Sequence, residues 1–221
     1  MSMSNVSEEE MESARSPGVI EVLKEGASIA TNVPILFGLY VIAAIATVFS
    51  SSLSGFVSII VTAIGTLVAY KGMGKNIDTE GSRVILIVYT FLASLVAGII
   101  GGFATLLLVI PGIYVTLRFQ FTTAAVMLDE RGPSSGLQQS WAISSGNVWT
   151  IFGIAAVFFG ISLVFSGGSI LATGGIPMGT TTEVVESLSN QIVYGSAVQS
   201  VLLGPVQLCC TVYMYEAFRA K

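Results

Sequence analysis

The sequence predicts an all-α integral membrane protein, a bundle of six transmembrane helices with two further amphipathic helices at the membrane interface. Hydrophobic residues make up 53% of the 221 positions and charged residues only 10%, where an average soluble domain has roughly a quarter. The mean hydropathy is +0.83. Several apolar segments also reach the roughly 20 residues that a helix needs to cross a bilayer.

The charge balance and the missing residue types exclude several classes of function. With a net charge of −4, the chain lacks the basic face that nucleic acid requires, so we expect no nucleic-acid partner. It contains no histidine, which is the commonest general base and a common zinc ligand. Cys209 and Cys210 are adjacent within an apolar run and have no further metal ligands at a useful spacing. We therefore predict no enzyme activity, no metal and no cofactor.

The N-terminal region differs in character from the rest. Residues 1–15 carry a run of glutamates without apolar periodicity, which predicts a disordered acidic cytoplasmic tail ahead of a single membrane domain, residues 16–221. Ser16-Pro17 is typical of a helix start. Apolar residues then recur at helical spacing, which predicts an amphipathic helix on the membrane surface, with a soluble linker helix as the alternative. These residues are Val19, Val22, Leu23, Ala27 and Ala30.

Hydropathy defines the spans. The six predicted ones are residues 33–50, 53–70, 84–109, 111–128, 148–165 and 191–215. The third and fourth come from one apolar run that is about twice the length of a single crossing. Pro111-Gly112 is the natural break in this run, and Gly101-Gly102 is a competing one. After the fourth span, Pro133 to Ser145 predicts the second amphipathic helix, stopped by Gly146.

The basic residues predict the orientation, because cytoplasmic loops carry the excess of lysine and arginine. With six spans and both termini in the cytoplasm, eight basic residues lie inside and none outside. If residues 84–128 crossed only once, the division would be five to three. We therefore expect a multi-pass protein of the cell membrane with cytoplasmic N- and C-termini. The eight residues are Arg15, Lys24, Lys71, Lys75, Arg83, Arg131, Arg219 and Lys221.

One segment carries a motif, IPGIYVTLRFQFTTAAVMLDERGPSSGLQQSWAISSGNVWTIFG. It resembles the signature of a family of prokaryotic membrane proteins. That family includes the membrane domain attached to some glycerophosphoryl diester phosphodiesterases, and also stand-alone uncharacterised proteins. The matching positions are Pro111, Gly112, Tyr114, Arg118, Phe119, Asp129, Gly132, Leu137, Ser140, Trp141, Ile143, Ser144, Gly146, Asn147 and Trp149.

The resemblance covers about 45 of 221 residues and implies a six-helix membrane domain without an established activity. Phosphodiesterases of that kind use a soluble barrel with histidine and metal, which this chain lacks. We interpret most of the motif as architecture. Gly146-Asn147 is expected to stop the surface helix, and Ser140 or Asn147 to satisfy backbone groups at helix ends. Trp141 and Trp149 suit the headgroup layer. The alternative is a lipid or substrate groove between this helix and the bundle.

Arg118 is the one charge placed well inside a predicted span, and such residues are costly and by default a functional hypothesis. Tyr114 lies one helical turn earlier on the same face, and Gln120 adds to the polarity of this span. One hypothesis is a site for an anionic headgroup or solute. In the alternative, Arg118 is satisfied by backbone carbonyls or by Gln199 or Gln207 of the sixth span, or snorkels to an interface.

Two functions follow from these patterns. The first is a non-enzymatic structural or accessory bundle that acts through membrane lipids or protein partners, with a homo-oligomer left open. The second is a small transporter or permease for an anionic or amphipathic solute, with Arg118 at its site. An intramembrane enzyme is a distant third, because it would need paired carboxylates, a Ser/His arrangement or a metal site within the bundle.

Overall fold

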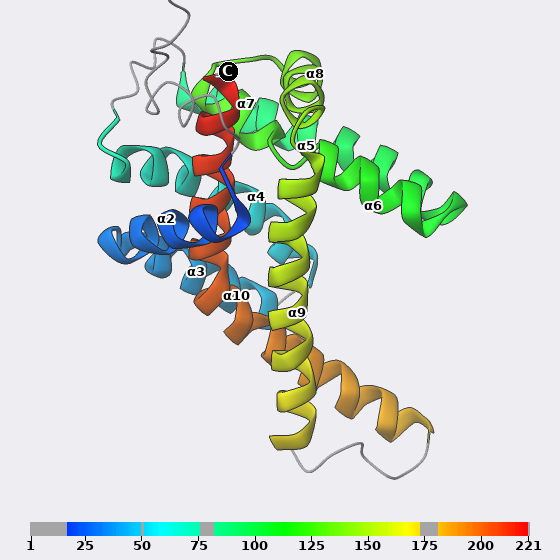
Figure 1. Ribbon diagram of the computed structural model, residues 1–221. Helices are drawn as coiled ribbons and strands as arrows, with labels where there is room; N and C mark the ends of the chain where they lie inside the picture. The colour runs from blue at the N-terminus through cyan, green and yellow to red at the C-terminus, as the bar shows by residue number, and fades with distance from the viewer. Residues whose placement is uncertain (1–16, 50, 76–81, 173–180, 221) are drawn as a thin grey trace, which may run out of the picture.

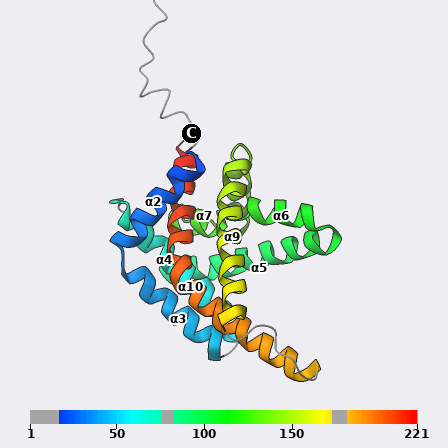
Figure 2. The same cartoon turned by 60° about the horizontal axis from the view of Figure 1, so that its bottom comes forward.

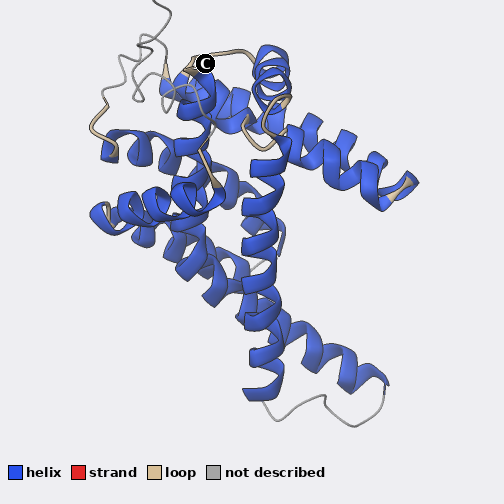
Figure 3. Cartoon of the chain, in the orientation of Figure 1, coloured by secondary structure: helices blue, strands red, loops and turns tan. Residues whose placement is uncertain are grey.

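The computed structural model describes residues 17–49, 51–75, 82–172 and 181–220. Within these residues every regular element is a helix (Figure 3), which confirms the all-α prediction. The predicted acidic tail, residues 1–15, lies outside the described residues. The helices are α2 Val19–Asn32, α3 Ile35–Phe49, α4 Ser51–Gly72, α5 Arg83–Leu107, α6 Val109–Arg118, α7 Thr122–Leu128, α8 Pro133–Ser144, α9 Val148–Ala172 and α10 Thr181–Arg219.

Helix α10 organises the bundle, because it packs against α2, α3, α4 and α9. Figures 1 and 2 both show α9 running beside α10, with α2 and α3 on the other side. In the same two views α5 and α6 form an adjacent pair that projects away from α9 and α10. The chain connecting α6 to α8 returns from this pair to the bundle, and α7 packs against α4, α5 and α8.

The described residues include four helices long and apolar enough to cross a membrane. They are Ser54–Gly72, Arg83–Leu107, Val148–Gly168 and Val193–Arg219. A fifth candidate is the pair α2 and α3, which passes the same test together but is bent by 89°. The first predicted span is therefore shorter than expected, since α3 alone has only 15 residues. The length and composition of these helices support four or five spans, and they do not confirm the predicted six spans with two interfacial helices.

The predicted fourth span, residues 111–128, is wrong as a continuous helix. It is divided into α6 and α7 by a turn at Phe119, Gln120 and Phe121. The turn that precedes it lies at Leu108, where the backbone is extended (φ −158°, ψ 131°), so α6 begins two residues before Pro111. Pro111 sits in the first turn of α6, where its missing N–H removes no helical hydrogen bond. The competing break at Gly101-Gly102 is wrong, because α5 continues to Leu107.

A helix lies at each of the two places where the sequence predicts an amphipathic helix. Helix α2 buries Val22, Gly26, Ile29 and Ala30 on one face. It begins at Val19, where the Glu21 carboxylate accepts a hydrogen bond from the backbone N–H of Gly18 at 3.3 Å. Helix α8 begins with a proline at its first position, as its sequence predicts, and ends at Ser144.

The core lies where α2 and α7 meet the C-terminal half of α10. Val22, Phe121 and Tyr215 are fully buried there, together with both cysteines. Contact between α2 and α10 is unusually close, because a Cβ atom at Gly26 would lie 2.3 Å from the Cys210 sulfur. Only glycine permits this approach, so α2 is an integral part of the bundle.

Candidate functional site

Arg118 lies at the end of α6 and is only 8% exposed. Its Nη1 donates to the Trp141 backbone carbonyl at 3.2 Å and to the Ser145 hydroxyl at 2.6 Å, and Nη2 donates to the Tyr114 hydroxyl. The guanidinium carbon is 4.9 Å from the ring centroids of both Tyr114 and Trp141. These four residues, Tyr114, Arg118, Trp141 and Ser145, form what we call the Arg118 node. Its charge is held by the protein's own carbonyl, hydroxyls and aromatic faces.

Two serines of α8 stabilise the break between α6 and α7. The Ser140 hydroxyl donates to the Arg118 carbonyl at 2.7 Å and accepts from the Phe121 backbone N–H at 3.1 Å. The Ser144 hydroxyl lies 3.2 Å from the same carbonyl and 2.6 Å from the Ser140 carbonyl. Both side chains are fully buried. Side-chain hydroxyls thus replace backbone hydrogen bonds, which is why a helix can stop in an apolar interior.

The other motif residues also have structural positions. A Cβ atom at Gly112 would lie 2.5 Å from the Thr105 Cα, so this glycine lets α6 run against α5. Gly132 precedes the first turn of α8. The Asn147 side-chain amide donates to the Ile143 carbonyl at 3.3 Å, just after α8 ends. Gly146 lies in the turn between α8 and α9, and Trp149 is 85% exposed at the start of α9.

The three glutamines of the sequence-predicted site lie elsewhere. Gln120, Gln199 and Gln207 line a cavity of about 460 Å³, which we call the glutamine cavity. Helices α3, α4, α7 and α10 surround it, and Gln120 enters from the break between α6 and α7. Its remaining hydrogen-bonding groups include hydroxyls of Tyr40, Thr62, Thr66, Thr123, Ser196, Ser200 and Thr211. Among the described residues, no acidic or basic side chain lines it.

The glutamines differ in their hydrogen-bond partners. The Gln120 amide nitrogen donates to the Thr211 hydroxyl at 3.3 Å, and the Gln199 amide nitrogen donates to the Ser162 hydroxyl of α9. Gln207 is exposed, and its amide has no hydrogen-bond partner among the described residues. The structure therefore brings Arg118 and Tyr114 together in one place and the three glutamines together in another.

A second polar space adjoins the glutamine cavity. A groove of about 400 Å³ runs between α5 and the α6–α7 break, lined by Ser94, Thr105 and Thr116 among others. Gln120 and Thr123 line both spaces. The two spaces therefore meet at the α6–α7 break, where both residues line them.

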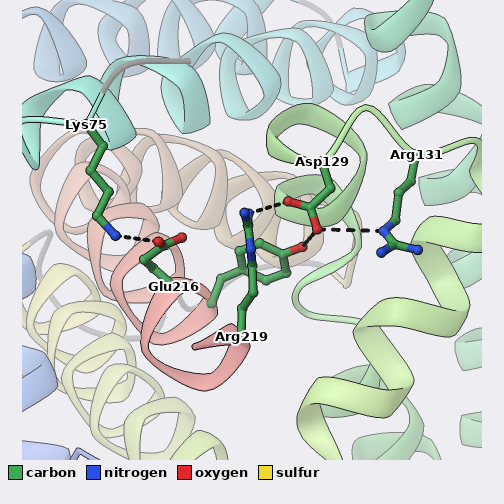
Figure 4. Close-up of polar contacts among 6 residues, drawn as sticks. Lys75, Asp129, Arg131, Glu216 and Arg219 are labelled. Atoms are coloured by element: carbon green, nitrogen blue, oxygen red, sulfur yellow. Dashed lines mark hydrogen bonds and ion pairs between the residues drawn. The ribbon is translucent and has the colours of Figure 1, made fainter. Parts of the chain in front are cut away.

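A charged cluster ties together the ends of three helices (Figure 4). Asp129, directly after α7, is paired with Arg219 and lies 3.6 Å from the Arg131 Nε, and it also accepts a hydrogen bond from the Tyr215 hydroxyl at 2.7 Å. Lys75, just after α4, is paired with Glu216 of α10. The sequence motif includes Asp129 but gives no sign of these partners, which lie about 90 residues away for Arg219 and 86 for Tyr215.

Comparison with known proteins places the chain in a family but assigns no activity. No curated protein and no solved structure matches it, so the phosphodiesterase-associated membrane domain that residues 110–153 resemble finds no support from this source. No group of three or more His, Cys, Asp or Glu side chains that could hold a metal ion occurs in the described part of the chain. Residues 28–218 match a domain of unknown function, DUF7847, and this match takes in α3 to α10 almost completely. The chain belongs to the DUF7847 family.

Proposed function

We propose that the protein is a non-enzymatic, multi-pass protein of the cell membrane that acts by holding a small amphipathic molecule inside its helical bundle. The glutamine cavity carries this proposal. It places amides and hydroxyls among helices that are otherwise apolar. A polar group left unsatisfied in an apolar phase costs several kcal/mol, so a ligand or water must satisfy the free Gln207 amide. The cavity volume falls within the range of roughly 300–1,000 Å³ that is usual for small-molecule sites.

The Arg118 node has a structural role in this proposal. Its guanidinium already uses both terminal nitrogens within the chain and is covered by two aromatic rings. An incoming anion would have to displace these partners. The node instead fixes the position of α8 against α6, and with it the serines that support the α6–α7 break.

The proposed topology has six crossings with both termini in the cytoplasm. In it, α6 and α7 cross together as a broken helix, and α2 lies at the interface before α3. The charged cluster supports the placement of these helix ends on one side of the membrane, because Lys75, Arg131 and Arg219 come from three separate segments that the basic-residue count also places together. On the motif resemblance of residues 110–153 alone, we also propose a fold shared with the phosphodiesterase-associated membrane domain.

Labelling of single cysteines tests the topology. Both native cysteines are buried and are replaced by alanine for this purpose. In sealed vesicles of known orientation, Thr180→Cys, between α9 and α10, should react with a membrane-impermeant reagent from the extracellular side, and Lys71→Cys should not. The reverse pattern would refute the orientation.

Native mass spectrometry tests the proposed function. Protein purified in its own lipids and released from nanodiscs should retain a small amphipathic molecule. Gln207→Leu should lose it, whereas Gln138→Leu, which changes an exposed glutamine on α8, should keep it. If wild type carries no such molecule, or both variants retain it equally, the proposal is wrong.

A transporter is the second candidate, and one observation favours it. The glutamine cavity and the groove between α5 and the α6–α7 break share Gln120 and Thr123, so polar groups continue from one space to the other. A carrier needs such a continuous route. Uptake of an amphiphile panel into sealed proteoliposomes tests this candidate, with loss of uptake expected in Gln120→Leu and not in Gln138→Leu. Absence of uptake across the panel would leave the holding function as the better proposal.

A further inference from the structure

We propose that the glutamine cavity selects an amphipathic molecule with an uncharged head that bears hydroxyl groups, and that Gln207 recognises this head through hydrogen bonds. This inference rests on the proposed function, because it names the class of molecule that the cavity holds. Three features of the described residues support it: the charges near the cavity, the hydrogen-bond state of the glutamines and the walls of the cavity.

The charges argue for a neutral head. No acidic or basic side chain among the described residues lines the cavity. The nearest charge along the chain is Arg118, two residues before Gln120, and its terminal nitrogens bond to Tyr114, Trp141 and Ser145 on the side of α8. Further along α10, Glu216 is paired with Lys75. An ion placed in the cavity would lose its hydration without gaining a counter-charge, which is strongly unfavourable.

The hydrogen-bond state of the glutamines argues for a ligand with donors. Gln120 and Gln199 use an amide N–H on hydroxyls of the protein, which leaves their carbonyl oxygens as acceptors. Gln207 presents both its carbonyl oxygen and its NH₂ group, since neither has a partner among the described residues. Hydroxyl groups match this set, because each one donates and accepts at the same atom. An ether or ester head would leave the glutamine oxygens unpaired.

The walls of the cavity argue for an apolar tail. Leu203, Leu208 and Val212 line it beside the polar groups. Tyr40 forms part of the opposite wall and lies close to α10, because a Cβ atom at Gly204 would be only 2.2 Å from its ring. A molecule with a hydroxylated head and an alkyl tail matches both kinds of surface.

Three probes with the same eight-carbon tail test the inference. Octyl glucoside is uncharged and hydroxylated, octyl phosphate is anionic, and octyltrimethylammonium is cationic. Binding to nanodisc-embedded protein is measured below the micellar concentration by equilibrium dialysis with radiolabelled probe. Each probe also partitions into the lipid, so only the difference between wild type and Gln207→Leu reports the cavity, and Gln138→Leu is the matched control.

We expect saturable octyl glucoside binding that weakens at least tenfold in Gln207→Leu and is unchanged in Gln138→Leu. The two charged probes should show no difference between wild type and Gln207→Leu. Gln199→Leu provides a second cavity variant if Gln207→Leu does not fold, and it should weaken octyl glucoside binding in the same direction.

Two results would overturn the inference, and they separate it from the proposed function. If octyl phosphate or octyltrimethylammonium binds in a Gln207-dependent way and octyl glucoside does not, the cavity holds an amphiphile of another class, and only the inference is wrong. If no probe binds in a Gln207-dependent way, the inference is also wrong, and the mass-spectrometric result then decides whether the proposed function survives.

Discussion

The Arg118 node and the glutamine cavity are only two residues apart along the chain, at Arg118 and Gln120, yet their polar groups differ in how they are satisfied. Arg118, at the end of α6, carries a full charge whose two terminal nitrogens bond to a carbonyl and two hydroxyls and whose guanidinium lies against two rings, while its buried Nε has no partner among the described residues. Gln120, two residues later, lines a cavity whose groups are uncharged and in part unpaired. The comparison shows that Arg118, the residue most costly to bury in an apolar bundle, finds partners for its terminal nitrogens within the chain itself. The neutral groups are the ones left available to a ligand.

The largest expected effect comes from removing the hydroxyl that supports the break beside the node. Ser140→Val leaves the Phe121 N–H without its partner and takes one donor from the Arg118 carbonyl. The unpaired Phe121 N–H costs about 1–3 kcal/mol, and the Arg118 carbonyl, which keeps Ser144 as a donor, loses one hydrogen bond worth about 1 kcal/mol, so we expect a loss of about 2–4 kcal/mol in the free energy of unfolding. Unfolding in mixed micelles with increasing dodecyl sulfate measures it.

Ser145→Ala is the matched control, because Ser145 is exposed and bonds to Arg118 and to the Trp141 carbonyl without supporting the break. It should lose less than half as much as Ser140→Val. Equal losses in the two variants would show that the break does not depend on Ser140.

Replacing Arg118 itself should have a smaller effect. Arg118→Leu removes charge-assisted hydrogen bonds and two cation–π contacts, but it also removes the cost of burying a charge. We expect a net loss of about 1–3 kcal/mol in unfolding free energy. Arg118→Lys should recover little of it, because an ammonium group cannot form the planar fork or stack on the rings. Full recovery by lysine would show that charge alone matters in the node.

The charged cluster around Asp129 differs from the Arg118 node because its arginines are partly exposed to solvent. Asp129→Asn removes the ion pairs with Arg219 and Arg131 while keeping an acceptor for Tyr215. Both arginine side chains are about 40% exposed, so we expect a loss of only about 1 kcal/mol. Salt should weaken wild type toward the variant, because exposed pairs are screened at high ionic strength. A stability difference that persists unchanged in 1 M salt would contradict this.

The smallest effect on stability is expected in the cavity. Gln207→Leu removes an amide that has no partner among the described residues, so the unfolding free energy should change by less than about 0.5 kcal/mol. Ligand binding should nevertheless be lost. A large loss of stability in ligand-free protein would show that Gln207 is a structural residue like Ser140.

Sequence reasoning predicts the features that depend on local patterns. Hydropathy predicts the helical membrane class and the positions of α4, α5, α9 and α10, and Pro133 and Gly146 bracket α8 closely. The motif led us to expect that Ser140 or Asn147 would satisfy backbone groups at helix ends, and both side chains bond to backbone groups there. Each of these signals lies within a few residues of the feature that it predicts.

The features that sequence reasoning misses depend on contacts between distant residues. Nothing in residues 111–128 predicts the turn at Phe119–Phe121, because the groups that stabilise it belong to α8, about 20 residues later. Hydropathy likewise does not predict that Arg118 and the three glutamines lie in different parts of the bundle. Their separation depends on which helix each side chain faces, and Gln120 meets Thr211 across 91 residues.

The most direct test of the difference between the two regions is their access to water. Gln207→Cys in the cavity and Ser144→Cys beside the node are compared in a background in which Cys209 and Cys210 are alanine, with a small uncharged water-soluble thiol reagent in nanodiscs. We predict rapid labelling of Gln207→Cys, slowed by octyl glucoside, and no labelling of Ser144→Cys, whose position is fully buried. Equal labelling of the two cysteines, or a Gln207→Cys that does not react, would contradict an open polar cavity beside a buried arginine and its buried neighbour Ser144.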